Sequence, residues 1–439
     1  MEWYLAGALA IGLVILLMAL SVPVAFAFFT ISGLGMLYMT GGEAGIIQVA
    51  VNANASVTKF AFLPIPLFLL MGELFFHTKV AVRVFDAFDV LFGRLPGRLS
   101  YLTVAGGTAF AALSGTSMGN TALLGSLLVP EMTDRGYKKY MAMGPILGTG
   151  GLAILIPPSG LGVLLGSLAK IDIGKLLIAG VLPGLVLATL YVLMIFAMVK
   201  LDPKAAPQYD VAVVPLRTKL LMIATHLLPM GLVVFMVIGL ILLGIATPTE
   251  SAAFGVLGVL VLAAAFRSLT WQAIVRSIRG ALIVTCMVLL VVMASSTFSQ
   301  ILAFSGATSG LVAWVEGLKL SPILILVLMF AVLLVMGMFM DQVSIMLLTI
   351  PIFFPLAQSM GFDLIWFGIV MLLSLEMSGI TPPFGLNLFV MMGVAPPGTS
   401  LGDVAKAAAP YVLCGIFLFA LLIAAPEIAL YLPSLMAIP

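Results

Sequence analysis

Two short segments combine glycine with hydroxyl, amide or carboxyl side chains inside otherwise apolar sequence. The first is Ser114-Gly115-Thr116-Ser117-Met118-Gly119-Asn120-Thr121, and the second is Gly337-Met338-Phe339-Met340-Asp341-Gln342. Oxygen atoms of this kind are ligands that Na+ requires, and a helix that begins at such a segment directs partial positive charge toward an anion. The alternative is that the small residues only allow helices to pack closely in a membrane.

Each polar segment is followed by a proline pair that interrupts a hydrophobic run. These pairs lie in Ile156-Pro157-Pro158-Ser159-Gly160 and Thr381-Pro382-Pro383-Phe384-Gly385, and a shift of 225 residues carries one onto the other. Helices that break at the same place in each half of a membrane protein are typical of a transporter whose site lies between the breaks. The matching break therefore favours an ion site at the first segment.

Three acidic residues lie within or beside apolar sequence. A carboxylate at membrane depth costs ~3 kcal/mol or more, so Asp341 is a candidate to ligate Na+, to take up a proton, or to accept hydrogen bonds from the exposed amides of its own turn. Glu376 either binds a coupling cation or braces the second broken helix. Glu250 is interpreted as the first-turn acid of a helix that Thr247 or Thr249 caps.

The composition is that of a membrane protein. Of 439 residues, 63% are hydrophobic and 8% are charged, against roughly 25% charged in an ordinary soluble domain. The two cysteines predict neither a disulfide framework nor a metal site. Paired catalytic groups and a phosphate-binding glycine loop are absent from the sequence. We therefore expect no enzymatic activity, no cofactor and no nucleic-acid partner, with the lipid bilayer as the surroundings.

The apolar runs predict an all-α polytopic membrane protein built from two repeats. Each repeat has about five transmembrane helices, including a broken helix, together with a re-entrant hairpin. The first repeat is 1–200, with the hairpin at 100–130 and the broken helix at 142–168. A cytoplasmic linker at 201–218 follows. The second repeat is 219–439, with the hairpin at 321–357 and the broken helix at 364–393. The remaining spans are expected at 3–20, 24–39, 47–77, 176–200, 219–244, 249–266, 280–304 and 407–434.

The distribution of Lys and Arg predicts how these repeats are oriented. Basic residues flank the first hairpin, border the linker and follow the span 249–266, which places all three regions in the cytoplasm and the N-terminus in the periplasm. An odd number of spans in each half then makes the repeats inverted, with the second hairpin on the opposite side. Lys170 and Lys175 fall on the outer side and are the exceptions.

Four motifs in order resemble those of one transporter family along essentially the whole chain. They are Leu113-Ser114-Gly115-Thr116-Ser117, Ile156-Pro157-Pro158-Ser159, Ile245-Ala246-Thr247-Pro248-Thr249-Glu250-Ser251-Ala252-Ala253 and Thr381-Pro382-Pro383-Phe384-Gly385. The chain resembles the large membrane (M) subunit of the tripartite ATP-independent periplasmic (TRAP) transporters.

This resemblance implies secondary active, Na+-driven uptake of a small organic acid anion across the bacterial inner membrane. The substrate class would be C4-dicarboxylates, sialic acids or 2-oxo acids. A periplasmic substrate-binding (P) protein would deliver the acid, and a small membrane (Q) subunit would be a separate chain. A block that contains both hairpins would move against a scaffold in an elevator mechanism.

The resemblance also implies individual site residues. One sodium site would use Ser114, Gly115 and Asn120 with backbone from Gly151 to Pro157. A second sodium site would use Gly337 and Asp341 with backbone from Gly379 to Thr381. The substrate would lie between the tips, near Thr116, Ser117, Pro158, Ser159, Pro383 and Asn387.

Two alternatives remain open at this point. A stand-alone divalent-anion/sodium symporter would need no binding protein, and only the motif resemblance speaks against it. A passive channel or a structural membrane subunit is disfavoured because a channel should carry a continuous polar stripe through several spans, whereas the polar residues here are confined to isolated tips.

Overall fold

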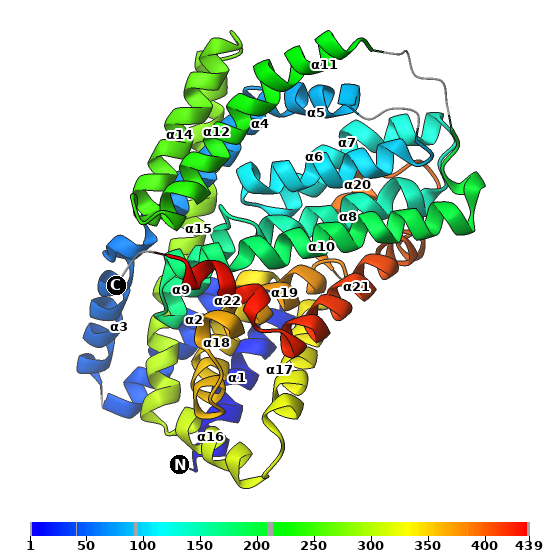
Figure 1. The fold of residues 1–439 in the computed structure, drawn as a ribbon. Coiled ribbons are helices and arrows are strands. Elements are labelled where there is room, and N and C mark those ends of the chain that lie inside the picture. The colour runs from blue at the N-terminus through cyan, green and yellow to red at the C-terminus, as the bar shows by residue number, and fades with distance from the viewer. Residues whose placement is uncertain (1, 41, 92–94, 209–213, 384, 437–439) are drawn as a thin grey trace.

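The computed structural model describes residues 2–40, 42–91, 95–208, 214–383 and 385–436, and these residues form helices and connections without a strand (Figure 1). The prediction of an all-α polytopic membrane fold is confirmed. Residues 209–213 of the predicted linker and Phe384 of the second break lie outside the described residues.

The helices of the first half follow the chain in short steps. They are α1 (Trp3–Ala19), α2 (Val24–Thr40), α3 (Glu43–Val57), the 3-10 turn η1 (Phe60–Phe62), α4 (Pro64–His77), α5 (Val80–Leu91), α6 (Arg98–Ser114), α7 (Ser117–Asp134), α8 (Lys139–Leu155), α9 (Gly160–Ala169), α10 (Ile173–Leu201) and the 3-10 turn η2 (Pro203–Ala205).

The second half opens with a helical run in which α- and π-helical turns alternate. This run comprises α11 (Leu216–Met222), η3 (Ile223–Leu227), α12 (Leu228–Val234), η4 (Phe235–Gly239) and α13 (Leu240–Leu242). It is followed by α14 (Pro248–Ala265), α15 (Trp271–Phe304), α16 (Ala307–Gly317), α17 (Pro322–Gly337), α18 (Gln342–Ser359), α19 (Leu364–Ser378), α20 (Leu386–Val394), α21 (Leu401–Ala424) and α22 (Glu427–Ser434).

Helix boundaries repeat between the two halves with the spacing of the sequence motifs. The helices α7 and α18 begin 225 residues apart, at Ser117 and Gln342, and so do α8 and α19, at Lys139 and Leu364. The start of α14 also matches the interpretation of Glu250, because Thr247 and Glu250 form a reciprocal capping box there. The opposite orientation of the two halves in a bilayer stays a prediction.

One predicted span is wrong. The stretch 47–77 is not a single helix, because α3 ends at Val57 and α4 begins only at Pro64. Pro64 and Pro66 lack the backbone N–H that a continuous helix would need, and an unbroken apolar pattern hid the interruption. The corresponding part of the second half contains no such prolines and forms the continuous 34-residue helix α15.

Fewer helices pass a strict test of length and apolarity than the ten spans expected. Seven of the described helical segments are long and apolar enough to cross a membrane, and α8 with α9 forms an eighth as a pair bent by 41°. Four others, α1, α2, α17 and α19, are apolar but shorter. Short helices of this kind can span when tilt, bilayer thinning or a neighbouring helix compensates for their length.

The centre of the fold is built around α8 and α19. Every residue of α8 from Met141 to Leu155 is buried, as is every residue of α19 from Trp366 to Ser378. The helix α8 packs against α6, α7, α10 and α21, and Figure 1 shows α6, α7, α8 and α10 side by side, with α1, α16, α17 and α18 grouped elsewhere. The helices α8 and α19, which lead into the two breaks, are therefore the innermost part of the fold.

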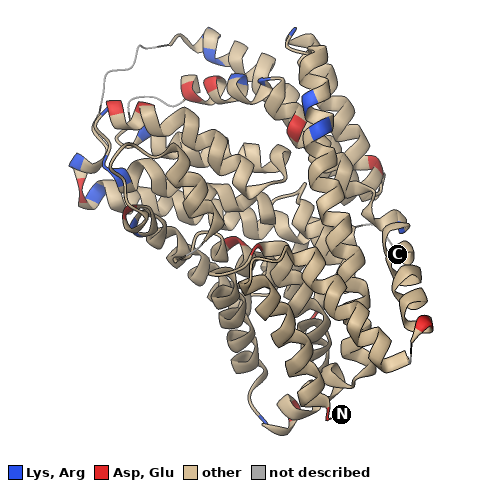
Figure 2. Ribbon diagram, turned by 180° about the vertical axis from the view of Figure 1, so that it is seen from behind, with Lys and Arg blue, Asp and Glu red and all other residues tan. Residues whose placement is uncertain are grey.

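Charged residues are concentrated away from this centre. Figure 2 shows Lys and Arg mostly in one part of the molecule, with few charges on the helices through its middle. Lys138 before α8 pairs with Asp202 after α10, and this hydrogen bond, together with a second from Tyr140, holds the pKa of the Asp202 carboxyl below its usual range. This basic part is the one that the sequence assigns to the cytoplasm.

Candidate functional site

The first polar segment is a tight turn between two helices. The helix α6 ends at Ser114, Gly115 follows with a φ of 63°, and Thr116 is extended as the N-cap of α7. A left-handed φ suits glycine because it has no Cβ to clash with the neighbouring carbonyl. The turn is therefore short, and it places the start of α7 beside the end of α6.

Three side-chain oxygen atoms at this turn are buried without a hydrogen-bond partner among the described residues. They are Ser114 Oγ, Asn120 Oδ1 and Thr121 Oγ1. The amide nitrogen of Asn120 donates to the carbonyl oxygens of Gly107 (3.4 Å) and Thr149 (3.2 Å), which fixes the side chain and leaves its oxygen free. An unpaired buried polar group costs ~1–3 kcal/mol, so each of these oxygens is a candidate to face a ligand.

These three oxygens fit a Na+ ion because they are hard, neutral oxygen donors held by helix ends. Ser114 and Asn120 belong to the predicted sodium site, whereas the sequence reasoning missed Thr121. The signal for it was present, because Thr121 follows Ser117 by four residues in α7 and therefore lies on the same buried face.

The first helix break faces this turn. The helix α8 ends at Leu155 and α9 begins at Gly160, with Pro157, Pro158 and Ser159 buried between them. A Cβ atom added to Gly115 would lie 3.1 Å from the Pro158 carbonyl oxygen, so the predicted sodium and substrate segments are in contact.

The hydroxyl of Ser159 is already engaged within this break. It donates to the Ile154 carbonyl oxygen (2.6 Å) and accepts from the Gly162 amide (3.0 Å), which makes Ser159 the N-cap of α9. Ser159 therefore shapes the break, and any contact that it makes with a substrate would be added to these two hydrogen bonds.

The second polar segment places Asp341 at the start of α18. Its carboxylate accepts hydrogen bonds from the amides of Val343 (3.0 Å) and Ser344 (3.2 Å), and from the Ser344 hydroxyl. Of the three roles left open by the sequence, the structure shows the bonding to amides of its own turn. A role in sodium binding stays a prediction.

The end of α17 is pressed against the second break. A Cβ atom added to Gly337 would clash with the Ser378 side chain at the end of α19. Beyond it, the Gly379 carbonyl oxygen accepts a hydrogen bond from the backbone N–H of Asn387 (2.9 Å). The Thr381 hydroxyl donates to the Met377 carbonyl oxygen (2.7 Å). The residues predicted for the second sodium site are therefore neighbours, with Thr381 half-buried. Pro383 is exposed.

Predicted substrate residues from the two halves meet directly. The side-chain amide of Asn387, at the start of α20, donates a 2.6 Å hydrogen bond to the Ser117 hydroxyl at the start of α7, and both side chains are buried. The helices α7 and α20 also pack along their length. The turn of one half and the break of the other thus form one region, as the sequence analysis expected.

Glu376 lies where the two innermost helices touch. It is fully buried, its Oε1 atom accepts a hydrogen bond from the Tyr191 hydroxyl (3.1 Å), and Oε2 has no partner in the described part of the chain. A Cβ atom added to Gly151 of α8 would clash with this carboxyl group. Glu376 therefore links α19 to α10 through Tyr191 and packs against α8 at Gly151, and one oxygen remains available.

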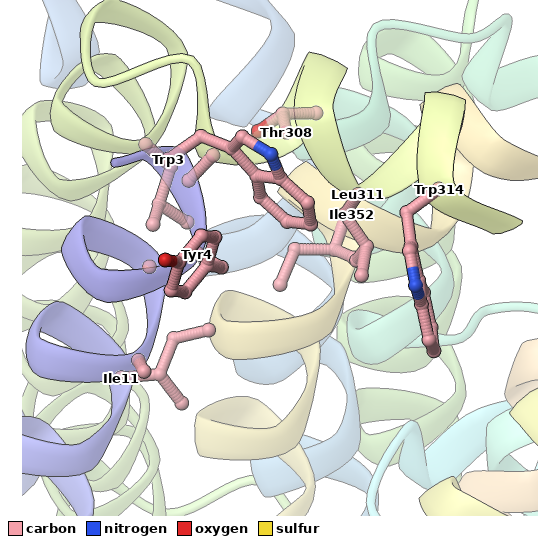
Figure 3. A pocket seen from close by; sticks show the side chains of 11 residues that line it. Trp3, Tyr4, Ile11, Thr308, Leu311, Trp314 and Ile352 are labelled. Carbon is pink, nitrogen blue, oxygen red and sulfur yellow. The ribbon is translucent and has the colours of Figure 1, made fainter.

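A cavity at the other end of the molecule contains none of the predicted ligands. It lies between α1 and α16, has a volume of about 410 Å³, and is lined mainly by apolar and aromatic side chains, including Trp3, Tyr4 and Trp314 (Figure 3). Tryptophan and tyrosine are typical of the membrane–water interface. This lining suits lipid contact better than recognition of a small acid.

Comparison with known proteins gives a consistent result. Residues 11–428 match the family described as "Tripartite ATP-independent periplasmic transporter, DctM component". The C4-dicarboxylate TRAP transporter large permease protein DctM of Pseudomonas aeruginosa is 33% identical over 390 residues, which are 88% of this chain and 89% of that protein.

Two other relatives are named for different solutes. The ectoine TRAP transporter large permease protein TeaC of Halomonas elongata is 29% identical over 431 residues, 97% of each chain. The isethionate TRAP transporter permease protein DctMQ of Oleidesulfovibrio alaskensis is 30% identical over 430 residues, 97% of this chain and 65% of that protein.

Among solved structures, the YdaH transporter of Alcanivorax borkumensis is similar, with a TM-score of 0.65 over 90% of each chain. At 13% identity, this similarity concerns the fold alone.

Proposed function

The chain belongs to the family of tripartite ATP-independent periplasmic transporters, as their DctM component, the large permease, and we propose that it drives uptake of a small organic acid anion with a Na+ gradient. It is a polytopic membrane transporter subunit and not an enzyme. The proposed location is the bacterial inner membrane, with the N-terminus in the periplasm, as the distribution of Lys and Arg favours.

The observation that carries sodium coupling is the set of unpaired oxygens of Ser114, Asn120 and Thr121 at the first turn. A bound cation would compensate all three, and it would add positive charge beside the start of α7, where an anion gains from the helix dipole. Backbone from Gly151 to Pro157 is proposed to complete this site. The second proposed site uses Gly337, Asp341 and backbone from Gly379 to Thr381.

The proposed substrate site lies where the two halves meet. It comprises Thr116, Ser117, Pro158, Ser159, Pro383 and Asn387. Arginine is absent from the described residues of this region, so binding of an acid would depend on helix ends, hydroxyls and bound Na+. Sodium and substrate should therefore bind with strong positive coupling.

Two partner proteins and one motion complete the proposal. A periplasmic substrate-binding protein would deliver the acid, and a small membrane subunit, as a separate chain, would join the scaffold. The relative named DctMQ supports the second partner, because this chain matches only 65% of its length. Both turns and both broken helices would move together as the block of an elevator, which the tight packing of α8 against α6 and α7 favours.

The deciding experiment is uptake into proteoliposomes that hold this chain and its small membrane partner. Radiolabelled organic acids are supplied with and without an inward Na+ gradient, and with and without the soluble binding protein. Uptake that requires both supports the proposal. Uptake with Na+ but without the binding protein identifies a stand-alone symporter, and flux that ignores the Na+ gradient contradicts both proposed sodium sites.

A further inference from the structure

A polar cavity with a volume of about 240 Å³ lies where α3, η1, α9 and α15 meet. Its walls carry Lys59 and Lys170, the hydroxyls of Ser295 and Ser299, and the amides of Asn52 and Gln300. Asn52 and Gln300 exchange hydrogen bonds of 2.6 and 3.1 Å, which fixes α3 against α15 along one side. None of these residues belongs to the proposed ion or substrate sites.

The groups that face this cavity are suited to an anion. Lys59 comes from the connection between α3 and η1, and Lys170 follows the C-terminal end of α9, so the two lysines belong to different walls, and both are exposed. Neither lysine forms an ion pair within the described ranges, and none of the described lining residues is acidic. No hydrogen bond joins the Ser295 or Ser299 hydroxyl to another described residue, so both are free to donate.

This polar lining is not a requirement of the repeated fold. The residues 225 positions away from the two lysines are Val284 and Ala395. Those that correspond to Ser295, Ser299 and Gln300 are Leu70, Leu74 and Phe75. Only Asn52 has a polar counterpart, Ser277, so the lysines and the two serine hydroxyls have no equivalent in the other half.

The helix α9 connects this cavity to the proposed substrate site. It begins at the first helix break, next to Ser159, and reaches Lys170 after ten residues, a distance of about 15 Å at the rise of an α-helix. An anion held by Lys170 would thus lie about one helix length from the break. The cavity also borders α3 and α15, so it lies between α9 and these two helices.

We propose that this cavity is a second binding site, which takes the carboxylate or sulfonate group of a small organic anion before it reaches the turns. The two ammonium groups would concentrate the anion, and the serine hydroxyls would donate to its oxygens. The proposed function needs no such site, and the cavity does not depend on sodium coupling.

The local potential can be measured without transport. Ser299→Cys is introduced into a full-length background in which Cys286 and Cys414 are replaced by serine. The thiol is modified with the anionic reagent sulfonatoethyl methanethiosulfonate and with a cationic trimethylammonium analogue, each rate being divided by that of free glutathione. A positive cavity should favour the anionic reagent by about tenfold. Ser296→Cys, which lines the same cavity, serves as a second reporter.

Charge variants identify the source of this preference. Lys59→Gln with Lys170→Gln should abolish it, and Lys59→Arg with Lys170→Arg should keep it. Lys319→Gln is the matched control, because Lys319 shares the left-handed backbone of Lys170, with φ values of 51° and 57°, but lies outside the cavity. Equal corrected rates for the two reagents in both reporters would overturn the proposal.

Ligand protection and uptake identify the anion. Succinate and isethionate should slow modification of Ser299→Cys, whereas protection by inorganic sulfate alone would exclude an organic ligand. In the uptake experiment, the double glutamine variant should raise the half-saturating acid concentration several-fold with maximal rate retained. If uptake ignores Na+ while organic anions still protect the thiol, the proposed function fails and this site stands.

Discussion

The side-chain amide of Asn387 donates a 2.6 Å hydrogen bond to the hydroxyl of Ser117, and this bond joins the turn of the first half to the break of the second. Each residue lies in the first turn of its helix, so the bond fixes how α20 sits against α7. Both are proposed substrate residues, and a substrate that enters between them would have to replace or extend this bond.

Asn387→Ala should weaken binding of the acid. Asn387 is a proposed donor to the acid, and a hydrogen bond to a charged group contributes about 1.5–3 kcal/mol. The half-saturating acid concentration in proteoliposome uptake should therefore rise about tenfold or more. In a double-mutant cycle, Ser117→Ala should add little to Asn387→Ala. Fully additive effects would show that the two side chains act independently.

Thr121→Val should weaken sodium binding without lowering the thermal stability of the protein. Valine keeps the shape of threonine and removes a buried hydroxyl that has no partner in the described structure, so thermal stability without Na+ should be unchanged or raised by about 1 kcal/mol. The half-saturating Na+ concentration should rise at the same time. Thr149→Val is the control, because the Thr149 hydroxyl is already bonded to the Pro145 carbonyl oxygen. Unchanged sodium dependence in Thr121→Val would remove this oxygen from the site.

Asp341 can be tested for capping and for sodium binding with two substitutions. Asparagine is as good an N-cap as aspartate, so Asp341→Asn should retain stability, whereas Asp341→Ala should lose about 1 kcal/mol. If the carboxylate also binds Na+, both variants should raise the half-saturating Na+ concentration. Normal sodium dependence in Asp341→Asn would leave capping as the whole role of this residue.

Gly151→Ala should destabilise the contact between the broken helices. Its Cβ atom would clash with the Glu376 carboxyl group, and overpacking of a filled core costs about 1–3 kcal/mol. Glu376→Ala makes room, so the double variant should be more stable than the sum of the single effects predicts. Thermal unfolding in detergent measures this. Strict additivity would mean that α8 and α19 separate more easily than their packing indicates.

The helix breaks were predictable because local chemistry causes them. Gly115 and the pairs Pro157–Pro158 and Pro382–Pro383 interrupt apolar runs, and the structure ends its helices at these places. The break before Pro64 was missed, although its prolines were visible, because apolar residues continue on both sides. Glycine and proline thus predicted the helix ends where they were taken into account. The break before Pro64 was missed where hydrophobicity alone decided the length of the span.

The contacts between the halves could not be predicted in the same way. Asn387 and Ser117 are 270 residues apart, and only tertiary packing brings them together. The sequence also could not predict that the Thr121 hydroxyl lacks a hydrogen-bond partner among the described residues. This depends on tertiary packing, because Gly150 of another helix, α8, lies against the hydroxyl. The sequence predicted the segments of the candidate sites, and the structure adds which atoms within them face one another.

Gly151 and Glu376 occupy the same position in their respective helices, 225 residues apart, and they touch each other. If the two halves are inverted repeats, as the sequence predicts, a residue that contacts its own counterpart lies on the axis that relates them. If the two halves were identical, the same residue would occupy both positions. Two glutamates would place two carboxyl groups in contact in the protein interior, and two glycines would leave a gap between the helices. In this chain the two positions differ, so the side of α8 without a side chain receives the carboxyl group that α19 carries.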